Sequence, residues 1–137
     1  MTPDALAALH ARCFITPPPW SAAEFCATLA SPGALLITES QGFLLGRVVA
    51  DEAEVITLAT APEARRQGIA SRLLATFLRD AVARGAVATF LEVAANNAPA
   101  IAFYISAGFA SHGRRKGYYS APDGSRTDAL LLNRTWP

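Results

Sequence analysis

The sequence predicts a single layered domain of the α/β (α+β) class, and three observations lead to this prediction. Segments with helical and strand-like spacing follow each other as two helices, three strands, one helix, one strand, one helix and two strands. The 137 residues are enough for one sizeable hydrophobic core. Hydrophobic residues make up 52% of the chain and charged residues 17%, which is typical of a folded globular protein. We therefore expect one domain over residues 1–137.

The two N-terminal helices are predicted from their start signals. Thr2-Pro3-Asp4 places a capping hydroxyl, a proline at the first helical position and an acidic residue in the first turn. Ser21-Ala22-Ala23-Glu24 matches a capping box, so a second helix begins there and carries Phe25 and Leu29 toward the core. The run 16–20 separates the two helices, because its three prolines lack the amide hydrogens that a helix needs.

Three strand-like runs and a long helix form the middle of the chain. The strands are expected at 34–38, 43–50 and 54–60, and the turn signal Ser40-Gln41-Gly42 separates the first two. A helix is expected from Gly68 to a stop at Gly85. Its inward face is predicted from apolar residues that recur at helical spacing, namely Ile69, Leu73, Leu74, Phe77, Leu78, Ala81 and Val82.

The C-terminal part is expected to add a strand, a short helix and a hairpin. The run Val87–Val93 is mostly apolar and predicts a buried strand. Asn96-Asn97-Ala98-Pro99 breaks that strand and begins a helix over 99–107. Strands at 109–119 and 127–132 are expected to pair around a turn at 122–124.

Charge and composition exclude several classes of function. The formal net charge of +1 gives no general basic excess, so we do not expect a nucleic-acid-binding protein. No run reaches the ~18 apolar residues of a membrane span. Cys13 and Cys26 are too few for a secreted disulfide scaffold, so we expect reduced thiols and a cytoplasmic location. His10 and His112 lie far apart with no Cys/His cluster, so no metal site is expected.

A basic, glycine-containing turn lies between the third strand and the long helix. In "APEARRQGIASRLL" (61–74), Arg65, Arg66 and Gly68 stand just before the helix begins. A helix N-terminus offers unpaired amide hydrogens and partial positive charge, and small residues let an anion approach the backbone. The turn is therefore a candidate phosphate-binding site, although a solvated basic turn would have the same sequence. It lacks both the P-loop ending and the three glycines of a dinucleotide fingerprint.

Two motifs resemble the cofactor motifs of the GNAT acyltransferase superfamily. "RRQGIA", preceded by "ITLATAPEA", resembles its acetyl-coenzyme A (acetyl-CoA) signature at a strand-to-helix turn. "LEVAANNAPAIAFYISAGF" (91–109) is similar to its second cofactor motif. "PPWSAAEF" and "GRRKGYYSAPDGSRTDALLL" narrow the resemblance to the RimI-type branch, the protein N-terminal alpha-acetyltransferases, which include the ribosomal-protein-alanine enzymes. The resemblance implies a mixed central sheet flanked by helices. Since this sequence starts almost at the first helix, we expect the family's first strand to be absent or very short.

The resemblance implies acetyl transfer from a thioester to an amine, with two catalytic side chains. Glu92, a carboxylate in an otherwise apolar strand, would be the general base, directly or through water. Without the resemblance, Glu92 could equally face solvent or pair with an arginine. Tyr104 would be the general acid that protonates the departing thiolate, although helical spacing alone makes it a core residue.

The resemblance also implies a set of acetyl-CoA-binding residues and no metal. Arg65 and Arg72 could serve the remaining phosphate or face solvent. Asn97 could bind the cofactor or simply cap the helix. The expected set comprises Leu58, Ala59 and Thr60 along the pantetheine arm, Arg65, Arg66, Gln67, Gly68, Ile69, Ala70 and Ser71 around the phosphates, and Asn97.

Two aromatic residues are candidates for the acceptor side. Trp20 could form a wall of a peptide groove or act as a core anchor, and Tyr118 could lie at a groove lip or a sheet edge. The resemblance implies that the acceptor is a protein or peptide N-terminus, such as that of a ribosomal protein. A small-amine or lysine acyltransferase and a non-catalytic acyl-CoA-binding module are the alternatives, and the presence of both Glu92 and Tyr104 argues against the second. The sequence does not predict the oligomeric state.

Overall fold

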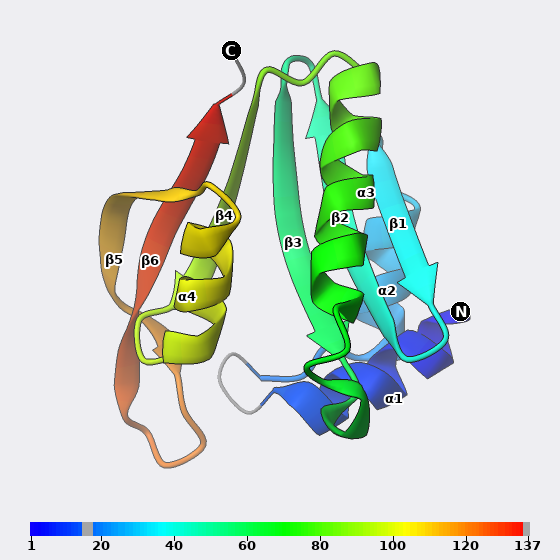
Figure 1. The fold of residues 1–137 in the computed structure, drawn as a ribbon. Coiled ribbons are helices and arrows are strands. Elements are labelled where there is room, and N and C mark those ends of the chain that lie inside the picture. The colour runs from blue at the N-terminus through cyan, green and yellow to red at the C-terminus, as the bar shows by residue number, and fades with distance from the viewer. Residues whose placement is uncertain (15–17, 136–137) are drawn as a thin grey trace.

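One six-stranded sheet organises the part of the chain that the computed structural model describes, residues 1–14 and 18–135 (Figure 1). The strand order is β1-β2-β3-β4-β6-β5. Only the β3–β4 pair is parallel among these strands, so the sheet is mixed, as predicted. The elements are α1 (Pro3–Cys13), α2 (Ala22–Leu29), β1 (Ala34–Glu39), β2 (Gly42–Val49), β3 (Glu52–Thr60), a short 3₁₀ turn (Pro62–Ala64), α3 (Ile69–Ala83), β4 (Ala88–Ala94), α4 (Ala98–Ser106), β5 (Ala110–Ser120) and β6 (Arg126–Thr135).

The order of the elements confirms the sequence prediction, and the predicted caps form. Thr2 accepts a hydrogen bond from the amide of Ala5 at 3.1 Å, and Ser21 and Glu24 make both bonds of the capping box. No strand precedes α1 in the described residues. The prediction for the run 16–20 falls partly on residues 16 and 17, which lie outside the described ones, and no helix includes Pro18 or Pro19.

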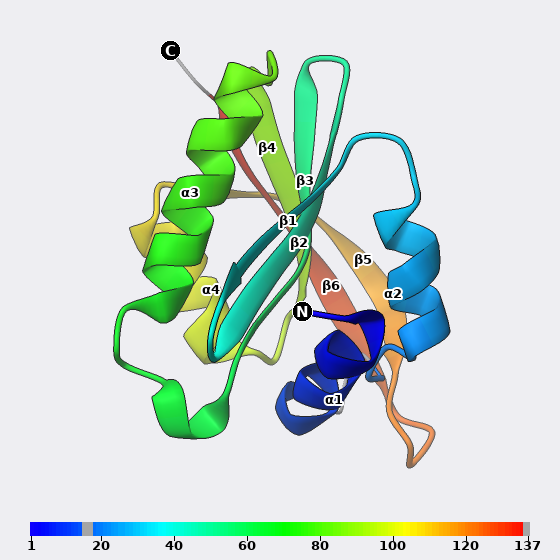
Figure 2. The same cartoon turned by 90° about the vertical axis from the view of Figure 1, so that its right-hand side faces the viewer.

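The helices form a layer on each face of the sheet (Figure 2). α3 and α4 lie on one face, and α1 and α2 lie on the other. α3 approaches β2 closely because Gly46 has no side chain, and a Cβ there would lie 2.3 Å from Cε1 of Phe77. On the opposite face Phe25 of α2 packs edge-on against Phe43 of β2, with ring centroids 5.6 Å apart. The core therefore has two halves, one on each side of β2 and β3.

Three residues that were expected to be buried are exposed. Val82 was expected on the inward face of its helix but is 44% exposed on the solvent side of α3. Val87 and Phe90, which belong to the predicted buried strand, are also exposed. Successive side chains of a strand point to opposite faces, and the start of β4 buries only the face that carries Thr89 and Leu91. An apolar run could not show which face would remain uncovered.

The sheet divides between β3 and β4. These two strands pair at only four positions, from Glu52 with Ala88 to Val55 with Leu91. At the same place β3 contains a bulge against β2, because Gly46 pairs with Val55 whereas Leu45 pairs with Thr57, leaving Ile56 as an extra residue. Beyond this point β3 stays with β2 and β4 stays with β6, so the two halves of the sheet separate (Figure 1).

Candidate active site

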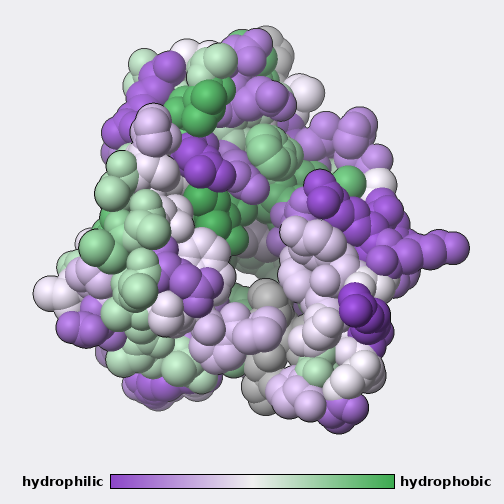
Figure 3. All heavy atoms as spheres, turned by 180° about the vertical axis from the view of Figure 1, so that it is seen from behind, coloured by the Kyte–Doolittle hydropathy of each residue, from purple (hydrophilic) through white to green (hydrophobic). Residues whose placement is uncertain are grey.

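A cavity of about 700 Å³ lies where β3 and β4 separate. From behind, the surface is hollowed between the two halves of the molecule, and apolar side chains come to the surface inside the hollow (Figure 3). The lining combines residues from far apart in the sequence. It includes His10, Cys13, Phe14 and Trp20, residues 55–60 of β3, Arg65, Arg66 and Ala70, residues 91–94 of β4, and Asn97, Pro99, Ala100, Phe103, Tyr104 and Tyr119.

The second half of β3, which contains Leu58, Ala59 and Thr60, forms one wall of the cavity. The β4-facing edge of β3 has no strand partner after Val55, so its backbone groups are available to an extended ligand. The side-chain oxygen of Thr60 is buried and has no hydrogen-bond partner in the described residues. A buried, unpaired hydroxyl is costly, and a polar ligand in the cavity would satisfy it.

The basic turn closes one end of the cavity in a conformation suited to an anion. Arg66 and Gly68 both adopt left-handed backbone angles, with φ of 66° and 76°. This conformation is strained for an arginine, which is a feature of backbone at functional sites. No side chain caps the N-terminus of α3, so its first amide hydrogens stay available. A smaller hollow of about 190 Å³ beside the turn is lined by Thr60, Ala64, Arg65, Arg66, Gly68, Ile69, Ala70, Ser71 and Phe103.

The structure distinguishes the basic residues of this turn from each other. Arg72 binds Glu39 through two hydrogen bonds of 2.8 and 3.0 Å and also donates to the carbonyl of Gln67 at 3.0 Å. Arg72 therefore braces the turn, and this pairing lowers the pKa of Glu39. Arg65 and Arg66 are exposed, and no carboxylate pairs with either among the residues that the structure describes. Their charges remain available to a ligand.

Glu92 both pairs with an arginine and lines the cavity. Its side chain is only 22% exposed and lines the cavity from β4. One carboxylate oxygen also lies 3.2 Å from Nη2 of Arg115 on β5. This ion pair fixes the orientation of the carboxylate at the edge of the cavity.

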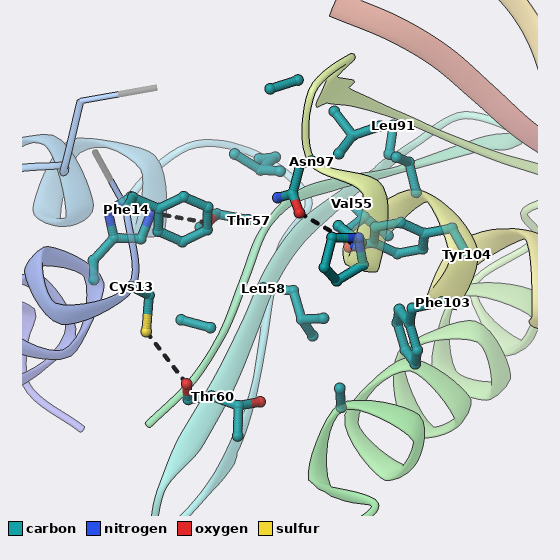
Figure 4. Close-up of a pocket in the computed structure, with 18 of the residues that line it drawn as sticks. Cys13, Phe14, Val55, Thr57, Leu58, Thr60, Leu91, Asn97, Phe103 and Tyr104 are labelled. Carbon is teal, nitrogen blue, oxygen red and sulfur yellow. Dashed lines mark hydrogen bonds between the residues drawn. The ribbon is translucent and has the colours of Figure 1, made fainter. Parts of the chain in front are cut away.

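Tyr104 likewise belongs both to the core and to the cavity. It is 7% exposed, and its ring packs edge-on against Phe109 with centroids 5.6 Å apart. Figure 4 shows Tyr104 and Phe103 on α4 facing Leu58 across the cavity, so Phe103 is a lining residue and not only a core residue. Burial raises the pKa of Tyr104 well above its ordinary value of 10.0. The phenol therefore keeps its proton at neutral pH.

Asn97 and Trp20 also belong both to the fold and to the cavity lining. Asn97 caps α4 by accepting a hydrogen bond from the amide of Ala100 at 3.3 Å, and it lines the cavity as well. Trp20 lines the opposite side, while its ring packs against Phe25 at a centroid distance of 5.1 Å. Both residues therefore have a structural contact and also line the cavity.

Of the predicted site residues, Gly68, Ile69 and Ser71 line only the smaller hollow, and Tyr118 and Gln67 line neither space. Tyr118 is 49% exposed beside Arg115, whereas its neighbour Tyr119 faces the cavity. Burial, followed by the nearby charge of Glu92, raises the pKa of Tyr119 to about 12. The sequence could not choose between two adjacent tyrosines, because the irregular pairing of β5 between Arg115 and Tyr119 decides which one turns inward.

The last turn of α1 was missed by the sequence analysis, although it forms part of the wall. His10 is 1% exposed and bonds to Thr57 on β3 at 2.9 Å. Cys13 donates to the carbonyl of Thr60 at 3.3 Å, and Figure 4 shows Cys13 and Phe14 on the wall opposite α4. Helical spacing could have indicated that these residues point inward, because His10 and Cys13 lie on the same face of α1 as the buried Leu6.

Two further features bear on ligands and location. Residues 1–14 and 18–135 contain no group of three or more side chains that could hold a metal ion. Within the same residues, no helix has both the length and the apolar character needed to cross a bilayer.

Comparison with known proteins gives a consistent picture. Residues 5–109 match the model of the acetyltransferase (GNAT) family. The chain is 40% identical over 90 residues to the [ribosomal protein bS18]-alanine N-acetyltransferase of Escherichia coli K12, a match that covers 66% of this chain and 60% of the relative. It is 36% identical over 137 residues to the N-alpha-acetyltransferase RimI of Mycobacterium tuberculosis, covering 93% and 83% of the two chains. The crystal structure of the ribosomal-protein-S18-alanine N-acetyltransferase from Escherichia coli superposes with a TM-score of 0.83 at 32% identity, covering 94% and 84%.

The burial of His10 predicts a specific loss of stability in mild acid. Burial lowers the pKa of His10 from 6.5 to about 4, and Glu24 opposes this shift only in part. Below pH 6.5 His10 becomes protonated in the unfolded chain, whereas in the folded chain it stays neutral until about pH 4. Acid therefore favours the unfolded state. The free energy of unfolding, measured by urea denaturation, should therefore fall as the pH is lowered from 6.5 toward 4.

Substituting His10→Gln should flatten this part of the stability profile, whereas His112→Gln at an exposed histidine should not. Hydrogen bonds lower the pKa values of the Glu39 and Glu63 carboxyls, which moves their protonation toward the acid end of this window. Equal slopes between pH 4.5 and 6.5 in the wild type and His10→Gln would contradict the prediction.

Proposed function

We propose that this chain, which belongs to the GNAT acetyltransferase family, transfers an acetyl group from acetyl-CoA to the alpha-amine of a protein or peptide N-terminus. The observation that carries the proposal is the convergence of three features on one cavity. Glu92 and Tyr104 both line it, the free edge of β3 runs along it, and the basic turn before α3 closes one end. Among the described residues, a carboxylate, a protonated phenol and a basic turn come together at this cavity.

The residues at the cavity fit acetyl-CoA as the acetyl donor, which supplies a reactive thioester when bound. The turn from Arg65 to Ser71 would hold its phosphates through the charges of Arg65 and Arg66 and the free amides of α3. The free edge of β3 would bind its extended arm, as an added strand does. The buried hydroxyl of Thr60 would find a partner on the same arm.

Glu92 is proposed as the general base. A peptide alpha-amine has a pKa of about 8 and lysine one of about 10.4, so the alpha-amine is the easier of the two to use as a neutral nucleophile near pH 7. Glu92 would accept the proton that the amine loses as it attacks, directly or through water. Arg115 would hold the carboxylate in place during this step.

Tyr104 is proposed as the general acid. Its raised pKa keeps the phenol protonated, so it carries a proton to give. It would deliver that proton to the sulfur that departs from the acetyl group. Burial against Phe103 and Phe109 keeps its ring in one orientation at the cavity.

The acceptor is inferred to be a protein N-terminus, such as that of a ribosomal protein, because the similar enzyme of Escherichia coli is named for alanine of ribosomal protein bS18. Trp20 and Tyr119 line the cavity and would form the acceptor side. A cytoplasmic location would suit such a substrate.

The first test is acetyl transfer followed by mass spectrometry. Acetyl-CoA is offered with peptides that begin with Ala, Ser, Met or Gly, with N-blocked lysine peptides and with polyamines. One added acetyl group on a free alpha-amine is the expected result. Acetylation confined to lysine or polyamine would move the function to a side-chain or small-amine acyltransferase. Acetyl-CoA binding without any product would favour a non-catalytic module.

Removing either proton-transfer group should lower turnover without weakening acetyl-CoA binding. Glu92→Gln and Tyr104→Phe are each expected to reduce kcat by ~10²- to 10⁴-fold, the usual contribution of one acid or base. Activity would be measured with the peptide that the wild-type enzyme acetylates, and the Kd of acetyl-CoA by calorimetry. The exposed Tyr118→Phe is the matched control and should keep near-normal turnover. Normal kcat in both main variants would reject the assignment.

Reversing a charge in the turn before α3 should weaken the binding of acetyl-CoA. Arg66→Glu is expected to raise the Kd of acetyl-CoA by roughly ten-fold or more, since it replaces an attractive charge with a repulsive one beside the phosphates. Arg79→Glu makes the same change of charge on the exposed side of α3, where Arg79 pairs with its neighbour Asp80, and should have little effect. If both variants bind acetyl-CoA alike, the turn is not the phosphate site.

A further inference from the structure

His10 connects two walls of the cavity that belong to different parts of the chain. Its Nδ1 lies 3.0 Å from the backbone nitrogen of Trp20, which lies just before α2 in the chain. Its Nε2 lies 2.9 Å from Oγ1 of Thr57, which is in the second half of β3. His10, Trp20 and Thr57 all line the cavity. One buried imidazole therefore joins the α1–α2 side of the site to the strand beside the proposed donor.

These two contacts determine where the ring carries its proton. A backbone N–H can only donate, so Nδ1 of His10 must be an unprotonated acceptor. In a neutral imidazole the proton then lies on Nε2, and this N–H donates to Oγ1 of Thr57. The depressed pKa of His10 agrees with a neutral ring.

The direction of this bond leaves the Thr57 hydroxyl with a proton to donate. Its oxygen accepts from His10, and no other hydrogen bond of this hydroxyl is found in the described part of the chain. Thr57 is 8% exposed and faces the cavity. Side chains alternate along a strand, so Thr57 points to the α1 side, away from the side of Leu58 and Thr60. A ligand carbonyl on the α1 side of the cavity would complete the network.

We propose that His10 is a positioning residue of the acceptor site, which holds Trp20 in place and directs the Thr57 hydroxyl toward a carbonyl oxygen of the bound peptide. The inference rests on the proposed function and specifies how the acceptor is held. Each group in the chain from the Trp20 amide through His10 to Thr57 polarises the next, which strengthens the final donor. Alpha-amines of peptides carry a carbonyl two bonds away, whereas polyamines have none, so this donor favours a peptide acceptor.

His10 does not serve as the proton acceptor in this arrangement. Both ring nitrogens are occupied by groups of the protein itself, so neither can reach the amine. The ring is also held by a stack against Phe14 with centroids 4.3 Å apart and an edge contact with Phe25 at 5.4 Å. It therefore orients its partners and leaves proton transfer to the groups already described.

The kinetic test removes the hydroxyl donor and then restores it. Thr57→Val is expected to raise KM for the acetylated peptide about ten-fold, the effect of one lost hydrogen bond in a buried site, while KM for acetyl-CoA stays normal. Thr57→Ser keeps a hydroxyl and should regain most of the affinity. Circular dichroism and thermal unfolding confirm that each variant is folded. Unchanged peptide KM in folded Thr57→Val would overturn the proposal.

Two substitutions of His10 separate its two bonds. An asparagine amide can reach the Nδ1 position and keep an acceptor for Trp20, whereas a glutamine amide can reach the Nε2 position and keep a donor for Thr57. Both His10→Asn and His10→Gln are expected to fall between the wild type and His10→Leu in peptide KM. Equal peptide KM in His10→Leu and the wild type would also overturn the proposal.

The ring proton is observed directly by nitrogen NMR of histidine-labelled protein. The chain has two histidines, and the His112→Gln variant assigns the signals of His10. We expect the Nε2–H tautomer at pH 7 and a largely neutral ring down to pH 5. Glu24 of α2 is the charged group found to act on His10, and the other groups packed on it, Phe14, Trp20, Phe25, Phe43 and Thr57, do not titrate in this range. An Nδ1–H tautomer would overturn the proposal without any reference to activity.

Failure of this inference differs from failure of the proposed function. If the wild-type enzyme acetylates no peptide, the proposed function fails before any variant is compared. If it acetylates peptides and the Thr57 and His10 variants keep normal peptide KM, only the positioning role fails. The tautomer measurement needs no substrate and stands apart from both results.

Discussion

The separation of β3 from β4 is the constraint on which the rest of the structure depends. Two parallel strands that pair at four positions and then diverge leave one strand edge unpaired inside the molecule. The bulge at Ile56 increases the local twist at the point where pairing ends. An unpaired edge is normally unfavourable unless something else satisfies its backbone groups. Here the cavity brings that edge to a place where an extended ligand can bind.

Elements from both ends of the chain close the space that this separation opens. α4 brings Tyr104 to one side, and the last turn of α1 brings His10 and Cys13 to the other. The protein groups that line the cavity differ from one end to the other. Charged, exposed arginines and free helix amides lie at the turn before α3, while a polar network of backbone, imidazole and hydroxyl lies on the α1 side. The two ends of the cavity therefore differ in chemistry, with cationic groups and free amides at one and uncharged hydrogen-bonding groups at the other.

Several residues both stabilise the fold and line the cavity. An interpretation of such a residue as only structural or only functional is therefore incomplete. Asn97 caps a helix and lines the cavity, and Glu92 pairs with Arg115 while it faces the same space. A residue held by a structural contact has little freedom, and a catalytic or binding group needs that restriction to act from one position. The structural contact is therefore compatible with the proposed role in each case.

The sequence by itself determined the order of the elements, the helix caps and the basic turn, because these depend on neighbours within a few residues. Helical spacing, a capping box and a glycine before a helix are local signals. Only the tertiary structure decided that Tyr119 and not Tyr118 faces the cavity, that Phe90 is exposed, and that His10 bonds to Thr57. Those outcomes depend on which faces of distant strands and helices meet, and a bulge or an uncovered sheet face changes them without leaving a signal in the sequence.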